Sequence, residues 1–112
     1  MLIYKILTAD QWQDLQAAGE TQGAPIDVND GYVHFSTASQ AAETAAKHFA
    51  GQQGLWLLAL EAETLGEALK WEISRGEQLF PHLYAPLSMA DVIWAKPLPW
   101  SEGRHQFPGD MA

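Results

Sequence analysis

A histidine and three hydroxyl side chains lie close together in residues 31–40, whose sequence is GYVHFSTASQ. His34 lies in the apolar first half of this segment. The hydroxyl residues follow where a helix is expected to begin, at Ser36, Thr37 and Ser39. A helix N-terminus offers free backbone N–H groups and a positive dipole end, so this junction could bind an anion or a hydroxyl group. An imidazole beside it could act as a general acid or base.

A second histidine occupies a similar setting in residues 80–84, FPHLY. His82 and Tyr84 are two positions apart, so on a strand both face the side opposite Leu83. Polar side chains in apolar strands need hydrogen-bond partners, because burying them unpaired costs free energy. We therefore expect His34 and His82 to converge on one cleft as its catalytic residues, with Tyr84 as a ligand-binding residue.

The other predicted ligand-binding residues are polar groups close to the first histidine or on the first strand, namely Lys5, Ser36, Thr37 and Gln40. Gln40 follows Ser36 by about one helical turn and could point back to the cleft. Lys5 could contact a phosphate group, or its amine could extend past its apolar neighbours to solvent.

Each of these residues also has a purely structural explanation. His34 could donate to a neighbouring strand, and one of the hydroxyls could simply cap the helix, worth about 1 kcal/mol. His82 and Tyr84 could pack in the core with their polar tips bonded to backbone. No metal site is expected, because His34, His48 and His82 never have i, i+4 spacing and form no ligand pattern with carboxylates.

Composition excludes several classes of protein. Fourteen acidic and six basic residues give a formal net charge of −8 over 112 residues, which repels phosphate backbones and makes nucleic-acid binding unfavourable. The absence of cysteine excludes disulfides and thiolate chemistry. No apolar run approaches the length of a membrane helix, so a cytoplasmic protein without membrane attachment is expected.

The pattern of apolar and turn residues predicts an α+β protein. Predicted strands span residues 2–7, 32–35, 55–61, 69–73, 79–83 and 92–96. Two helices are predicted in the N-terminal half, over 9–18 and 38–50, separated by a loop over 21–31. Thr8 and Gln11 have capping-box spacing at the start of the first helix. This order favours an α+β arrangement over a doubly wound sheet.

Residues 1–98 are predicted to form one domain. Residues 99–112 contain prolines and glycines without periodicity, and we expect them to form a C-terminal tail that lies over the surface or is mobile.

Several motifs together resemble a known bacterial family. They are IYKIL, DGYVHFSTASQ, LWLLALE, the Trp71–Glu72 pair and LFPHLYAPL. In order and spacing, over about residues 2–98, they resemble the family called domain of unknown function 952. The chain has Ala85 where that family commonly has glycine, so the backbone there must accept a Cβ atom.

The resemblance implies a fold similar to that of the ADP-ribosyltransferases, which is a small split or mixed β-sheet with a cleft that holds NAD in active relatives. On that template the Tyr4–Lys5 pair matches an aromatic–basic pair on the first strand, and residues 34–38 resemble the Ser-Thr-Ser strand. The glutamate that active enzymes carry on a later strand has no match, and Glu72 and Glu77 are the nearest glutamates. RNA 2′-phosphotransferases share the template but use several arginines, which both motifs lack here.

The sequence thus predicts a small-ligand pocket, with NAD or a related nucleotide as the ligand implied by the resemblance and transferase or hydrolase chemistry as the implied activity. One alternative is a catalytically inactive accessory or protein-interaction domain that retains the fold. Another is a regulator that acts on a larger metabolic enzyme.

Overall fold

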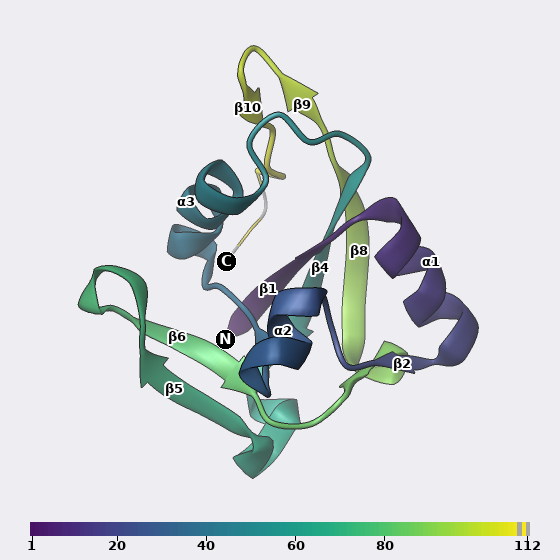
Figure 1. The fold of residues 1–112 in the computed structure, drawn as a ribbon, viewed down its shortest axis with the longest axis vertical. Coiled ribbons are helices and arrows are strands. Elements are labelled where there is room, and N and C mark those ends of the chain that lie inside the picture. The colour runs from purple at the N-terminus through teal and green to yellow at the C-terminus, as the bar shows by residue number, and fades with distance from the viewer. Residues whose placement is uncertain (110, 112) are drawn as a thin grey trace.

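The computed structural model describes residues 1–109 and 111 (Figure 1). Its α-helices are α1 (Ala9–Ala18), α2 (Pro25–Asp30) and α3 (Ala38–His48), and short 3₁₀ helices span Ala62–Ala68, Arg75–Glu77 and Met89–Asp91. The longer strands are β1 (Leu2–Leu7), β4 (Leu55–Glu61), β5 (Leu69–Ile73), β6 (Leu79–Leu83) and β8 (Val92–Leu98). The two-residue strands are β2 (Glu20–Thr21), β3 (Val33–His34), β7 (Leu87–Ser88), β9 (Trp100–Ser101) and β10 (Arg104–His105).

The strands form two three-stranded sheets, β1–β4–β8 and β3–β6–β5, together with the small ladders β2–β7 and β9–β10. The α+β class is therefore confirmed. The strands thus form separate sheets, and all of the named ladders are antiparallel, so none of these sheets mixes parallel and antiparallel pairs. None of the helices in residues 1–109 and 111 is long and apolar enough to cross a membrane.

The β1–β4–β8 sheet lies between α1 and α3 (Figure 1). Leu58 of β4 belongs to the same core cluster as Trp12 of α1, and the neighbouring Leu57 belongs to a second cluster with Ala45 of α3. Because successive strand residues point to opposite faces, a strand covered on both faces needs an apolar residue at nearly every position. This explains the continuous apolar run of β4.

A capping box fixes the start of α1, as predicted. The Thr8 side chain accepts a hydrogen bond from the Gln11 N–H at 3.2 Å, and the Gln11 side chain accepts one from the Thr8 N–H at 2.9 Å. The helix ends at Gly19, whose φ of +83° is the left-handed conformation that glycine adopts without strain. At α3, the Gln40 side chain accepts from the Thr37 N–H at 3.1 Å, and the helix ends two residues earlier than predicted.

The prediction of a loop over residues 21–31 is wrong for Pro25–Asp30, which form α2. The residue before this helix is Ala24, which has no capping oxygen, so the usual start signal is absent. The Asp27 side chain instead accepts a hydrogen bond from the Ala24 N–H at 2.8 Å. Pro25 at the first helical position is compatible with this start.

The tail predicted over residues 99–112 is also corrected, since its first part forms the β9–β10 hairpin. His105 of β10 is 7% exposed and contacts the carbonyl oxygen of Gln52 through Nε2 at 2.9 Å. The ring of Trp100 packs edge-on against it, with 4.8 Å between ring centroids. The part of the prediction that concerns residues 110 and 112 lies outside the described residues.

A single bridge between Tyr4 and Ser36 joins the two larger sheets. The Tyr4 N–H donates to the Ser36 carbonyl at 2.7 Å, and the Ser36 N–H donates to the Tyr4 carbonyl at 2.9 Å. No further rung of this ladder forms among the described residues, so the free edge of β1 and the strand β3 diverge. This divergence leaves the space in which the candidate site lies.

Candidate functional site

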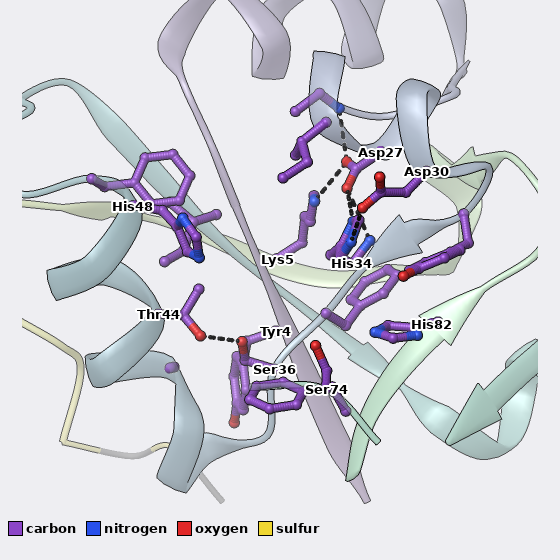
Figure 2. Close-up of a pocket in the computed structure, with 18 of the residues that line it drawn as sticks. Tyr4, Lys5, Asp27, Asp30, His34, Ser36, Thr44, His48, Ser74 and His82 are labelled. Atoms are coloured by element: carbon purple, nitrogen blue, oxygen red, sulfur yellow. Dashed lines mark hydrogen bonds and ion pairs between the residues drawn. The ribbon is translucent and has the colours of Figure 1, made fainter. Parts of the chain in front are cut away.

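A cavity of about 780 Å³ lies between β1, α2, α3 and the β3–β6–β5 sheet (Figure 2). This volume is in the range of sites for small-molecule ligands. Aromatic and aliphatic side chains line much of it, and polar groups gather on two sides. We call them the β3 side (Lys5, Asp27, Asp30, Tyr32, His34 and His82) and the α3 side (Ser36, Thr44, His48 and Arg75).

The two predicted catalytic histidines meet on the β3 side. His34 of β3 is the register partner of His82 of β6, and directly opposite residues of an antiparallel pair project from the same face. Their ring centroids are 5.3 Å apart, at an interplanar angle of 65°. The ring of Tyr32 stacks on His82 with 4.2 Å between centroids. Both histidines line the cavity, so their predicted convergence is present in the structure.

A buried carboxylate organises this side of the pocket (Figure 2). The Asp27 side chain is fully buried, and its Oδ2 accepts from Lys5 Nζ at 2.7 Å and from the Ala24 N–H at 2.8 Å. Its Oδ1 accepts from the His34 N–H at 3.0 Å and lies 2.6 Å from His34 Nδ1. Burial alone would raise the pKa of Asp27, but the bonds from His34 and Lys5 outweigh it and lower the pKa to about 2. The carboxylate is therefore ionised and accepts four hydrogen bonds.

His34 is held from both sides. Because an ionised carboxylate only accepts hydrogen bonds, the proton between Asp27 and His34 is on Nδ1. Its other ring nitrogen, Nε2, lies 3.0 Å from Asp30 Oδ2. Each ring nitrogen of His34 therefore faces one carboxylate. With Asp30 in this position, neither nitrogen of His34 is left for a ligand.

Lys5 lines the cavity but does not reach solvent. It is 6% exposed, and its amine is bound to Asp27. Burial lowers the pKa of Lys5, and the charge of Asp27 offsets this only in part. Sequence reasoning missed Asp27, although a lysine in a buried strand was a signal that a distant carboxylate had to compensate it.

His82 has a different environment from His34. It is 3% exposed, and its Nδ1 lies 2.8 Å from Glu72 Oε1, which also accepts from the Tyr84 hydroxyl at 2.7 Å. The hydrogen bonds from Tyr84 and His82 lower the pKa of Glu72, and the carboxylate raises the pKa of Tyr84 to about 12. An ionised Glu72 holds the proton on His82 Nδ1, which makes Nε2 the basic nitrogen. Within residues 1–109 and 111 no hydrogen bond engages Nε2 of this cavity-lining ring.

The remaining predicted residues divide between the cavity and its surroundings. Ser36 is buried and lines the cavity, as do Lys5 and the two histidines. Thr37, Gln40 and Tyr84 lie outside the cavity lining. The Gln40 amide donates to the Leu79 carbonyl at 2.8 Å and so joins α3 to β6.

The α3 side contains residues that sequence reasoning did not select. Arg75 follows the β5 strand, and its Nη2 donates to Thr44 Oγ1 at 2.9 Å while its Nε donates to Glu43 at 3.2 Å. The guanidinium lies over the ring of Phe80, 4.9 Å from its centroid. His48, one turn of α3 beyond Thr44, lies 3.4 Å from Arg75 Nη1. The only feature of the sequence that could have indicated this group was an isolated arginine, Arg75, in the turn between β5 and β6.

The fold and pocket thus define an α+β protein with a cavity of a size that small-molecule sites have. Residues 6–95 match the family described as protein of unknown function (DUF952), and the chain belongs to this family. The resemblance found in the sequence is therefore confirmed at the level of the family. The likeness to ADP-ribosyltransferases stays a prediction.

Solved structures of a relative agree with the fold. A crystal structure of protein CC0527 from Caulobacter crescentus has a TM-score of 0.92 and 50% sequence identity, covering 95% of this chain and 94% of that chain. The solution NMR structure of CC0527 has a TM-score of 0.84 and 49% identity, covering 93% and 90%. The search of curated proteins found no match.

Proposed function

We propose that the protein binds NAD or a related nucleotide in the pocket of about 780 Å³, with His82 facing the reactive part of the ligand and the His34 ring beside it. One observation carries the proposal: His82 lines the cavity with Nδ1 held by Glu72 and with Nε2 open. The mixture of aromatic lining and polar groups suits a ligand with an aromatic base and polar substituents. The ADP-ribosyltransferase-like fold, inferred from the sequence resemblance, is the reason for naming NAD.

The proposed chemistry is group transfer or hydrolysis with His82 as general base. Its Nε2 accepts a proton from a ligand hydroxyl or from water, and Glu72 stabilises the imidazolium that forms. Glu72 lies outside the cavity lining, so it acts through His82 as a positioning residue. This differs from the glutamate of active ADP-ribosyltransferases, which the resemblance places at the ribose or the nucleophile.

Histidine side-chain NMR tests the proposal directly. NAD and ADP-ribose at millimolar concentration should shift the ring signals of His34 and His82 and raise the melting temperature. His105 is an internal control, because its ring is bonded to Gln52 outside the pocket. The variant His82→Gln should remain folded and lose the ligand-induced change in melting temperature. Ring signals of His82 that do not move with either nucleotide would overturn the proposal.

A second candidate is an accessory or protein-interaction domain without catalytic activity. The observation that favours it is the saturation of His34, whose two ring nitrogens face Asp27 and Asp30. In that case His34→Ala and His82→Ala lower stability and leave partner capture unchanged. Nucleotide-dependent shifts at His82 would argue against this second function.

A further inference from the structure

We propose that the α3 side of the pocket is a phosphate subsite, formed by Arg75 with the hydroxyls of Ser36 and Thr44 and the ring of His48. This inference rests on the proposed function and names a part of the ligand that the β3 side does not bind. All four residues line the same cavity as the two predicted catalytic histidines, and Thr44 and His48 project from α3 towards it (Figure 2).

Arg75 is held in place and still has unused donors. A guanidinium carries five N–H groups in a fixed planar fork. The hydrogen bonds to Glu43, Thr44 and His48 use three of them. Within the part of the chain that the structure describes, the other two have no hydrogen-bond partner. The side chain is only 19% exposed and rests on Phe80, so a phosphate would meet a preformed fork.

The hydroxyl groups extend this donor set. Thr44 Oγ1 accepts from Arg75 Nη2 and lies 2.8 Å from Ser36 Oγ. When Thr44 donates its own proton to Ser36, the Ser36 hydroxyl proton becomes free to point into the cavity. The chain from Arg75 through Thr44 to Ser36 therefore ends in a neutral donor beside the cation. Mixed cationic and hydroxyl donors are what phosphate oxygens bind.

The charge balance also favours an anion on this side. Glu43 is shared between Arg75 at 3.2 Å and Lys47 at 3.9 Å, so one carboxylate faces two cations. On the β3 side, by contrast, the Lys5 amine and the His34 ring face two carboxylates, Asp27 and Asp30. A local positive excess in a chain of net charge −8 concentrates the attraction for an anion at this part of the cavity.

His48 provides a reporter for occupation of the subsite. Burial and the neighbouring charge of Arg75 lower the pKa of His48. A bound phosphate would add negative charge beside the ring and raise that pKa again. His105, which lies outside the cavity lining, is the control for changes that do not arise in the pocket.

The experiment is a titration with inorganic phosphate at constant ionic strength, followed by NMR of the His48 ring and of Arg75 Nε. Three variants are compared with the natural sequence. Arg75→Gln should weaken phosphate binding at least about tenfold, because a charge-assisted bidentate contact is lost. Glu43→Gln should strengthen binding severalfold, since it removes the competing carboxylate. Arg104→Gln, the matched control, should have no effect, because Arg104 lies outside the cavity lining.

Misfolding can weaken phosphate binding but cannot strengthen it. Weaker binding by Arg75→Gln together with stronger binding by Glu43→Gln would therefore show a subsite and not a loss of folding. Equal phosphate binding by the natural protein and Arg75→Gln would overturn the subsite, and so would weaker binding by Glu43→Gln. If NAD shifts His82 while phosphate leaves His48 unchanged, the subsite fails and the proposed function stands. If phosphate shifts His48 while NAD leaves His82 unchanged, the subsite stands without the proposed function.

Discussion

The two three-stranded sheets of this protein are built on different principles. In β1–β4–β8 the central strand is covered on both faces by apolar side chains, and Leu57 and Leu58 are fully buried. In β3–β6–β5 the cavity face carries His34 and His82, each bonded to a carboxylate. Apolar burial stabilises without directional constraints, whereas buried ionic groups stabilise only when every partner is in place. The first sheet therefore maintains the fold, and the second positions polar groups at the pocket.

We expect the largest loss of stability for Asp27→Ala, because Asp27 joins Lys5 of β1 to His34 of β3. Removing the carboxylate leaves the Lys5 amine buried without a counterion and the Ala24 N–H without its acceptor. We expect a loss of about 4 kcal/mol in the free energy of unfolding, measured by urea denaturation. Asp30→Ala removes a partly exposed carboxylate from the same histidine and should cost less than about 1 kcal/mol. Equal losses in the two variants would contradict the role assigned to Asp27.

A core truncation in the β1–β4–β8 sheet should lower stability almost as much but should leave the pocket unchanged. Leu58→Ala removes a fully buried side chain that packs with α1, and we expect a loss of about 3 kcal/mol. The ring signals of His34 and His82 should keep their positions in the folded variant. Displaced signals would show that the two sheets are not independent.

The ionised Asp27 should make stability depend on pH in the acid range. Its pKa in the folded protein is about 2, below the ordinary value of 3.8, so its stabilisation is complete above about pH 4. As pH falls from 4 towards 2, the unfolded chain binds the proton first, and about 2 kcal/mol of stability is lost. Denaturation curves across this range should show the loss for the natural protein. The Asp27→Asn variant should lack this component.

The smallest effect on stability is expected for Glu72→Gln, in the second sheet. The Glu72 side chain is 42% exposed, so we expect only a small loss in the free energy of unfolding. The pKa of Tyr84 should nevertheless fall from about 12 towards its ordinary value of 10, as measured by phenolate absorbance. Glu67→Gln, which removes an exposed carboxylate outside the site, is the control and should leave that pKa unchanged. A large loss of stability in Glu72→Gln would place Glu72 in the fold-maintaining part of the molecule.

Local sequence signals predicted the elements whose stability is local or simply apolar. The capping box at Thr8 and Gln11 marked the start of α1, and the apolar run of residues 55–61 marked β4. The segment that became α2 gave no such signal, because its cap comes from Asp27 inside the helix. The β9–β10 hairpin was missed because His105 is buried through a bond to Gln52, 53 positions away.

The same distinction applies to the pocket. The sequence by itself determined that His34 and His82 lie on apolar strands, that Lys5 lies on another, and that all three need polar partners. Only the tertiary structure decided which partners they have, joining Lys5 to Asp27 across 22 positions and His82 to Glu72 across ten. The physical reason is that a hydrogen bond depends on distance and direction in space, whereas strand alternation and helix capping depend on neighbours along the chain.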